Sequence, residues 1–279
     1  MNWEVHAIVR KSSTLSVLTP IKDKVLTHQF DGSFESLSRI MSLANPNIVF
    51  HLASAFIPQH KSSDIDLILD SNIKFGTQLL EAMTINGVYK LINTGTSWQN
   101  YNDEIYNPVS LYAASKQAFQ DIIEYYVKAL KLRAVTLKLF DTYGPGDPRK
   151  KLIHLLMSLR NNGKELAMSP GEQFIDIVYV DDVIDAFIAS ADLLLRGDVP
   201  EHDEFAVSSG KVATLREVVK IFEEVCGEQL RIIWGAREYR YREVMFPWKT
   251  GVPVPGWVPN VQLKDGLKKI IEWQKVNNP

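Results

Sequence analysis

Short apolar runs alternate with helical patterns along the first half of the chain. Runs of four to eight apolar residues between polar turns are typical of buried strands, and apolar residues spaced three and four apart indicate amphipathic helices. The expected strands are Val5–Val9, Val25–His28, Ile48–His51, Leu91–Thr94 and Ala134–Phe140, and the expected helices are Phe34–Leu43, Asp66–Ile85 and Leu111–Leu130. This alternation predicts an α/β fold with helices on both faces of a doubly wound parallel sheet.

The pattern changes after the turn cluster Tyr143-Gly-Pro-Gly-Asp147. Shorter elements follow, and Thr214 and Glu217 have the spacing of a capping box at the start of one helix. The expected helices are Leu152–Asn161, Val183–Leu195, Leu215–Cys226 and Leu263–Trp273, with short strands near Ile175–Val180, Phe205–Ser208 and Leu230–Trp234 and a loop at Thr250–Pro259. These elements predict a second, smaller α/β lobe.

The composition excludes several classes of function. Hydrophobic residues make up 46% of the 279 residues and the formal net charge is −2, so the chain is globular and has no basic stripe for nucleic acid. Cys226 is the only cysteine, and the six histidines lack a ligand spacing, so we expect neither a disulfide nor a metal. The apolar runs are too short to span a bilayer and the N-terminus lacks signal-peptide features, which predicts a cytoplasmic protein with no membrane partner.

Tyr112 and Lys116, in Tyr-Ala-Ala-Ser-Lys, have the spacing of a proton-transfer pair. Four residues apart on a helix, they lie on one face a turn apart. A phenol with a pKa of about 10 is a poor acid or base at neutral pH, and a nearby ammonium lowers that pKa. Thr94, at the end of a preceding strand, can then hold a substrate oxygen against the tyrosine. The same pattern also occurs on helix surfaces without chemistry, so its meaning depends on the surrounding chain.

Six groups of segments carry a family resemblance. They are Ile48–Ser54; Asn72–Ala82; Thr94 with Tyr112 and Lys116; Leu137–Asp147; Gly171–Gln173 with Val178–Val183; and Gly256–Trp257 with Leu263–Leu267. In this order they resemble the extended short-chain dehydrogenase/reductase family of nucleotide-sugar epimerases, dehydratases and ketoreductases, and they cover nearly all of the chain. The resemblance implies a Rossmann-like dinucleotide-binding domain at residues 1–145. It also implies a mainly substrate-binding lobe at 146–279, with segments that return to the first domain.

Three segments point to a subgroup. Asn93–Trp98, Lys138–Asp147 and Arg240–Val244 resemble the CDP-abequose and CDP-paratose synthase group, 4-ketoreductases that make 3,6-dideoxyhexoses. We therefore expect NADP-linked reduction of a CDP-4-keto-3,6-dideoxyhexose type of sugar, in the synthesis of bacterial surface polysaccharide such as O-antigen. The alternatives are a nucleotide-sugar C4 epimerase and a truncated, non-catalytic remnant or ligand-sensing protein.

The resemblance assigns catalytic roles to Thr94, Tyr112 and Lys116. Tyr112 would give a proton to the oxygen at sugar C4 as a nicotinamide hydride reaches the carbon. Lys116 would hold the nicotinamide ribose, and Thr94 would hydrogen-bond the same sugar oxygen. Family members that dehydrate sugars carry an Asp-Glu pair directly after the catalytic threonine. Gly95 and Thr96 stand there instead, so a ketoreductase or a C4 epimerase remains.

Arg10 and Lys11 follow the first expected strand, where a dinucleotide fold meets the adenosine ribose. Basic residues there accommodate a 2′-phosphate, which favours NADP over NAD. The other interpretation is two solvated charges at a strand end. The expected cofactor-binding residues are Arg10, Lys11, Asp31, Gly32, Leu52, Ala53, Ser54, Asn72, Tyr112 and Lys116.

The resemblance also implies a nucleotide-diphosphate sugar as substrate and a homodimer. Arginine guanidinium groups bind phosphate bidentately, which makes Arg240 and Arg242 candidates for the diphosphate. The expected substrate-binding residues are Thr96, Asp141, Arg149, Lys151, Gln173, Arg240 and Arg242. Two positions depart from the family pattern. Phe174 and Ile175 stand where an arginine is common, and Asp141 replaces an asparagine, where a carboxylate opposes a diphosphate unless it points elsewhere.

The glycine fingerprint G-x-x-G-x-x-G, which the family carries between its first strand and first helix, does not occur in the sequence. About two dozen residues of an opening strand–turn–helix unit are expected ahead of Trp3. Either the sequence begins at an internal methionine of a longer protein, or the chain is a natural remnant that no longer binds the cofactor normally. Without a strand between Val5–Val9 and Ile48–His51, we expect two unpaired edges, marginal stability or poor solubility, and weak cofactor binding.

Overall fold

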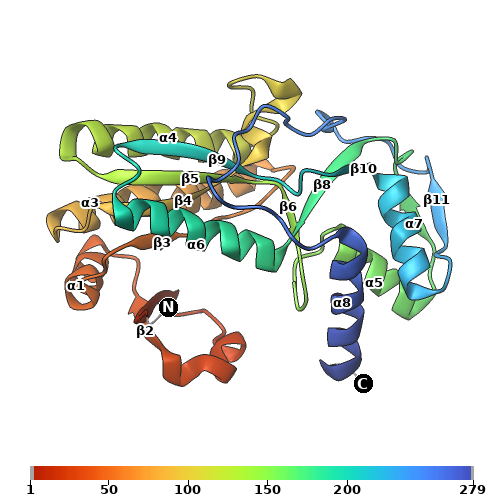
Figure 1. The fold of residues 1–279 in the computed structure, drawn as a ribbon, viewed down its shortest axis with the longest axis horizontal. Helices are drawn as coiled ribbons and strands as arrows, with labels where there is room; N and C mark the ends of the chain where they lie inside the picture. The colour runs from red at the N-terminus through yellow and green to blue at the C-terminus, as the bar shows by residue number, and fades with distance from the viewer. Residues whose placement is uncertain (1–2, 278–279) are drawn as a thin grey trace.

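The computed structural model describes residues 3–277 and contains the two predicted parts (Figure 1). The strands are β1 (Val5–Arg10), β2 (Val25–Phe30), β3 (Val49–His51), β4 (Lys90–Thr96), β5 (Arg133–Leu139), β6 (Asp141–Tyr143), β7 (Leu166–Met168), β8 (Phe174–Tyr179), β9 (His202–Val207), β10 (Val212–Thr214) and β11 (Ile232–Trp234). The α-helices are α1 (Phe34–Ala44), α2 (Ile65–Leu69), α3 (Phe75–Ile85), α4 (Leu111–Leu130), α5 (Leu152–Asn162), α6 (Val180–Arg196), α7 (Leu215–Cys226) and α8 (Leu263–Asn277).

A parallel sheet in the order β3-β4-β5-β9 forms the centre of the larger part. Helix α6 covers one face and α4 the other, as Figure 1 shows. Along β4, the buried Ile92 packs with the α6 side while its neighbour Leu91 packs with α3 and α4. This alternation is expected for strands whose two faces are both covered. The predicted doubly wound α/β fold is therefore confirmed.

Strands β1 and β2 form a separate parallel pair, in register from Val5 opposite Val25 to Arg10 opposite Phe30. Strand β1 hydrogen-bonds only with β2, and β3 only with β4, among the strands of residues 3–277. The two edges that the sequence predicts to be unpaired are thus unpaired in the structure. Side-chain packing still joins the pair to the core, because Trp3 contacts Phe50 of β3 with ring centroids 6.0 Å apart.

The smaller part gathers at one end of the sheet, to the right in Figure 1. A mixed sheet, β10-β8-β6, and a parallel pair, β11-β7, pack with α5, α7 and α8 around a common apolar cluster. Thr214 caps α7 through the predicted capping box, since its hydroxyl accepts from the Glu217 amide at 3.2 Å. Strand β9 and helix α6 return to the central sheet. The boundary at residue 145 stays a prediction.

Two features differ from the sequence interpretation. The helix expected over Asp66–Ile85 is interrupted by one turn of π-helix at Asp70–Lys74, between α2 and α3. Strands β6, β7 and β10 were not expected, because three residues are too few for a periodic signal. Helix α4, in contrast, begins and ends where the sequence predicts.

The unpaired edges lead to a prediction about local stability. Amide hydrogens of β1 and β2 should exchange at least about tenfold faster than those of β4 and β5, because a two-stranded sheet opens more easily than the centre of a larger one. Hydrogen-exchange mass spectrometry on the intact chain measures this difference.

An extended chain supplies the control. A designed N-terminal strand–turn–helix whose strand fits between β1 and β3 should protect β1 and β2 and raise the melting temperature. The same extension with a proline in the middle of its strand should do neither, because proline cannot donate to the ladder. Equal protection of all four strands without any extension would contradict this account.

Candidate active site

Helix α4 presents Tyr112 and Lys116 to the end of the central sheet. Ser110 caps the helix by accepting the Ala113 amide at 3.4 Å, so Tyr112 lies in the first turn and Lys116 in the next. Both side chains are buried, Tyr112 at 8% exposure and Lys116 at 1%. The predicted spacing therefore places both groups on one inward face.

The phenol of Tyr112 lies among two hydroxyls and a carboxylate. Burial raises the pKa of Tyr112 to about 12, the nearby hydroxyls of Ser54 and Thr96 oppose the rise, and the negative charge of Asp141 adds to it. Lys116 does not contribute to the shift, whereas the sequence interpretation expected it to lower this pKa. Tyr112 is consequently protonated at neutral pH and can donate a proton.

Thr94 is oriented differently from Thr96. The Thr94 hydroxyl donates to the carbonyl of His51, on the neighbouring strand, at 2.9 Å. Two residues on, Thr96 reaches the Tyr112 phenol. In this structure Thr96 and Ser54 are therefore the hydroxyls beside the tyrosine, and the catalytic role of Thr94 stays a prediction.

Lys116 is a buried cation without a partner. Its Nζ makes no hydrogen bond with any side chain or backbone group of residues 3–277, and burial lowers the pKa of Lys116 to about 8. An orphaned ammonium in this position needs acceptors. The two hydroxyls of a nicotinamide ribose would supply them, so the site fits the cofactor that the sequence predicts.

Asn72, at the centre of the π-helical turn, connects three segments around the site. Its Oδ1 accepts from the Ala55 amide at 2.7 Å and the Ser54 hydroxyl at 3.1 Å. Its Nδ2 donates to the Ala55 carbonyl at 3.2 Å and to the Ser115 hydroxyl at 2.9 Å. Asn72 thus fixes the loop after β3 against α4, and through Ser54 it positions a partner of Tyr112. Its expected contact with the cofactor stays a prediction.

The other expected cofactor residues are exposed and lie at the ends of β1, β2 and β3. Arg10 ends β1 and Lys11 follows it, while Leu52 and Ala53 follow β3. Asp31, after β2, accepts from the amide and the hydroxyl of Ser33 at 2.8 and 2.6 Å. The adjacent Gly32 has a φ of +99°, which favours glycine. All of them follow carboxyl ends of parallel strands, where ligands bind in open α/β sheets.

A group of cations and aromatic rings faces Tyr112 on the substrate side. The Phe56 ring packs edge-on against Tyr112 at 5.0 Å, and Lys151 lies 5.4 Å from the Phe56 centroid. Lys151 also pairs with Asp141 at 3.2 Å, and the charge of Asp141 acts on Arg149 and Arg240 as well. Asp141 therefore lies among cations that offset its negative charge. Its carboxylate would for this reason oppose a substrate diphosphate less than the sequence alone suggests.

Arg240 and Arg242, both expected to bind the substrate, lie in different surroundings. Arg240 pairs with Glu243 at 2.8 Å and lies 5.6 Å from the Trp98 ring, and Trp98 contacts Phe56. Arg242 instead stacks 4.4 Å from the Tyr101 ring and bonds with Asn107. Arg240 thus joins the group around Tyr112. The sequence interpretation did not include Phe56 or Trp98, since an aromatic residue in a loop carries no local signal of a site.

Gln173 is buried in the smaller part of the molecule. Its Nε2 donates to Ser169 at 3.3 Å, while its Oε1 makes no hydrogen bond with any group of residues 3–277. Its expected role in binding the substrate stays a prediction.

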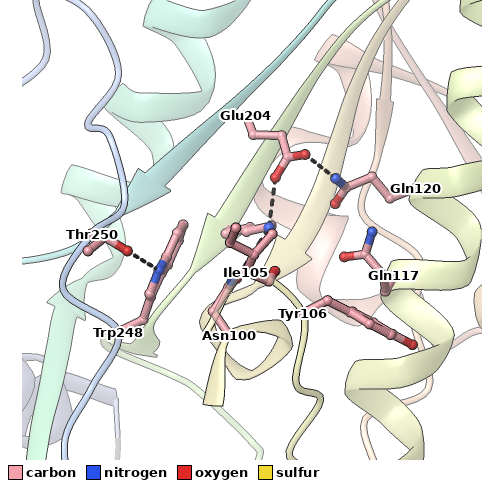
Figure 2. Close-up of a pocket in the computed structure, with 9 residues that line it drawn as sticks. Asn100, Ile105, Tyr106, Gln117, Gln120, Glu204, Trp248 and Thr250 are labelled. Atoms are coloured by element: carbon pink, nitrogen blue, oxygen red, sulfur yellow. Dashed lines mark hydrogen bonds and ion pairs between the residues drawn. The ribbon is translucent and has the colours of Figure 1, made fainter. Parts of the chain in front are cut away.

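Apart from the surroundings of Tyr112, a polar cavity lies between α4, strands β5 and β9, and the segment around Trp248 (Figure 2). It measures about 290 Å³. Lys138 pairs there with Glu204 at 2.7 Å, and the Glu204 carboxylate points toward Gln120 of α4. Its charged centre is already paired within the protein, since Lys138, Glu204 and Gln120 contact one another, so the cavity does not by itself indicate a ligand.

Two further findings concern the described part of the chain. Residues 3–277 contain no group of three or more histidine, cysteine or acidic side chains arranged to hold a metal ion. No helix in this part has the length and apolar character that crossing a bilayer requires.

Known proteins resemble this chain over most of its length. Residues 1–203 match the profile of the NAD dependent epimerase/dehydratase family. A CDP-abequose synthase of Salmonella typhimurium is 27% identical over 229 residues, which cover 80% of this chain and 75% of that protein. A UDP-glucuronate 4-epimerase of Thermodesulfobacterium geofontis is 25% identical over 261 residues, covering 88% and 77%.

The solved structures agree on the fold. The UDP-glucose 4-epimerase of Thermotoga maritima, solved with UDP-glucose, superposes with a TM-score of 0.86 at 23% identity, covering all of this chain and 93% of that one. The UDP-glucose 4-epimerase of Thermus thermophilus, solved with NAD, gives a TM-score of 0.81 at 22% identity, covering 97% and 91%.

The surroundings of Tyr112 predict the effect of a charge change. Asp141→Asn should lower the pKa of Tyr112, because a negative charge that disfavours the phenolate is removed. Ultraviolet difference titration of tyrosinate, comparing each chain with its own Tyr112→Phe variant, isolates this one phenol. An unchanged titration of Tyr112 would show that the carboxylate does not act on it.

Proposed function

The chain belongs to the NAD-dependent epimerase/dehydratase family, and we propose that within it the protein is an NADP-linked reductase of a nucleotide-activated 4-keto-deoxysugar. The observation that carries this proposal is the likeness to CDP-abequose synthase. Tyr112, buried on α4 one turn before Lys116, supplies the acid that reduction of a ketone requires at the oxygen.

The reaction divides between the cofactor and this chain's residues. When bound, a reduced nicotinamide supplies the hydride to the carbonyl carbon at C4. Tyr112 gives its proton to the carbonyl oxygen, so the ketone becomes an alcohol. Thr96 and Ser54 lie near the phenol, and Thr94, at the family's catalytic position, would be a further donor to the sugar oxygen. Lys116 holds the ribose hydroxyls.

The surroundings of Gly95 argue against a sugar dehydratase. Elimination across the sugar needs carboxyl groups directly after the catalytic threonine, and Gly95 and Thr96 provide none. A β-carbon at Gly95 would lie 2.9 Å from Gln99 Oε1 and 3.0 Å from the Thr136 methyl carbon. Position 95 therefore has no room for an acidic side chain unless its neighbours move.

The proposed substrate is a CDP-linked 4-keto-3,6-dideoxyhexose, used in bacterial surface polysaccharide such as O-antigen. The likeness to CDP-abequose synthase supports the sugar class. Arg149, Lys151 and Arg240 form the cationic group that would meet the diphosphate, because lysine and arginine are the usual phosphate-binding residues. The homodimer and the cytoplasmic location stay predictions from the sequence.

A C4 epimerase is the second candidate. The likeness to UDP-glucuronate and UDP-glucose 4-epimerases supports it, and the same triad would serve. An epimerase that starts from an alcohol needs Tyr112 as a base, whereas a reductase needs it as an acid.

The catalytic role of Tyr112 is tested by removing one oxygen. In the N-terminally extended chain, Tyr112→Phe should reduce turnover of a CDP- or dTDP-4-keto sugar by at least about 10²-fold, because positioned proton transfer is lost. Tyr125→Phe is the matched control, since Tyr125 lies on the same helix and is exposed. Turnover near the wild-type rate in Tyr112→Phe, with folding intact, would rule out this mechanism.

The choice of cofactor is tested at the end of β1. Arg10→Ala with Lys11→Ala should weaken binding of NADPH by about 1.5–3 kcal/mol and leave NADH less affected, because a charge-assisted contact to phosphate is lost. Lys22→Ala with Lys24→Ala is the control, because it removes two exposed lysines just before β2, at the opposite end of the β1–β2 pair. Calorimetric titration with both cofactors gives the comparison. An equal loss for NADPH and NADH would show that the pair does not contact the 2′-phosphate.

A further inference from the structure

A row of polar side chains crosses the central sheet on the face that α4 covers, with one residue from each strand. His51 of β3 bonds with Asn93 of β4 at 3.2 Å, Asn93 with Thr136 of β5 at 3.2 Å, and Thr136 with His202 of β9 at 2.9 Å. His202 continues to Glu124 on the outer part of α4 at 3.3 Å. His51, Asn93 and Thr136 are 0–1% exposed.

Such a row is costly in a protein interior unless each member is hydrogen-bonded. The opposite face of the same strands is apolar, with Ile92, Val135 and Leu137 packed against the α6 side. The polar row is therefore a specific feature of the α4 face, and the direction of its hydrogen bonds can be derived from its ends.

The carboxylate at the outer end fixes that direction. Glu124 can only accept, so a neutral His202 carries its proton on Nδ1 and leaves Nε2 as an acceptor. Thr136 must then donate to His202, which leaves its oxygen to accept from the Nδ2 of Asn93. The Oδ1 of Asn93 therefore faces His51, and His51 must donate from Nδ1. Every bond points from the active site outward to Glu124.

At the inner end of the row, the Nε2 atom of His51 has no hydrogen-bond partner among the residues that the structure describes. With its proton on Nδ1, His51 holds a bare acceptor at Nε2, which is buried and makes no hydrogen bond within residues 3–277. The remaining surroundings of the ring are apolar, with Phe119 at 4.9 Å and Phe75 at 6.0 Å between centroids. Burial lowers the pKa of His51 to about 3, and the positive charge of Lys116 contributes to that shift, while Asn93 opposes it.

Lys116 Nζ is thus a buried donor and His51 Nε2 a buried acceptor, both without a partner in residues 3–277, and the charge of Lys116 acts on the His51 ring. We propose that the row Glu124–His202–Thr136–Asn93–His51 fixes His51 in its Nδ1–H tautomer, so that Nε2 accepts a hydrogen bond relayed from the Lys116 ammonium through one buried water. His51 is in this view a positioning residue for Lys116. A buried site with a strong donor and a strong acceptor is of the kind that ordered water occupies. Only the importance of Lys116 for catalysis rests on the proposed function.

The consequence is a second anchor for the lysine. An ammonium has three donors, and two ribose hydroxyls would not use all of them. The acceptor at His51 gives the remaining hydrogen a fixed direction, which holds the amine in place whether or not a cofactor is bound. The outward direction of the row prevents the other tautomer of His51, which would place an N–H against the ammonium.

The tautomers can be read directly by NMR of the intact chain labelled with ¹⁵N in its histidine rings. The chain has six histidines, and His51→Gln and His202→Gln identify the two sets of signals. Both His51 and His202 should show a protonated Nδ1 and a bare Nε2 at neutral pH. A protonated Nε2 on His51 would overturn the proposal. The measurement involves no turnover, so its outcome does not depend on whether the protein is a reductase.

Two variants test the proposal, one at Lys116 and one within the row, and a third is a control. Lys116→Met should shift the Nε2 resonance of His51 and leave that of His202 unchanged, since only His51 faces the ammonium. Thr136→Val, which keeps the shape but removes the hydroxyl, should convert His51 to a mixture of tautomers. Asp121→Asn, another carboxylate on α4 outside the row, should change neither. A His51 signal that is unaffected by Lys116→Met, or a single tautomer that persists in Thr136→Val, would contradict the proposal.

Discussion

The buried ammonium of Lys116 is the constraint on which the rest of the site depends. Removing a charge from water costs several kcal/mol unless polar groups replace the solvent. Helix α4 carries this charge into the protein and is itself held by Asn72, which bonds to Ser115 one residue before the lysine. It also approaches α3 closely, because a β-carbon at Gly76 would lie 2.4 Å from the ring of Phe119. The lysine is thus fixed by its helix before any ligand binds.

The two faces of the central sheet have different roles. The α6 face is a dry core that stabilises the strands, whereas the α4 face carries polar residues from every strand of the sheet. Chemistry that moves a proton needs defined donors and acceptors close to a charged helix face, and an apolar face cannot provide them. Glu124 and Asn72, which contact no reacting atom in this account, therefore act on the site through the groups that they orient.

The sequence predicts the fold and the order of its elements well, because periodicity and capping are local. Ser110, Thr214 and the spacing of Tyr112 and Lys116 all leave signals within a few residues. The contacts that shape the site do not: Asn72 bonds to Ser115 from 43 residues away, and Thr136 bonds to His202 from 66 residues away. The pKa of Tyr112 was predicted in the wrong direction because burial, which raises it most, and the charge of Asp141 leave no signal in the spacing of Tyr112 and Lys116. A one-dimensional pattern contains no information about such distances.

The central claim is that Tyr112 serves as the acid in a net reduction at C4. The most direct measurement is the stoichiometry between NADPH oxidised and nucleotide-4-keto-deoxysugar consumed by the N-terminally extended chain, with deuterium on the transferable position of the cofactor. The account predicts one NADPH oxidised for each sugar reduced and deuterium at C4 of the product. Interconversion of two C4-epimeric nucleotide sugars, with no net oxidation of NADPH and no deuterium retained in the sugar, would contradict it.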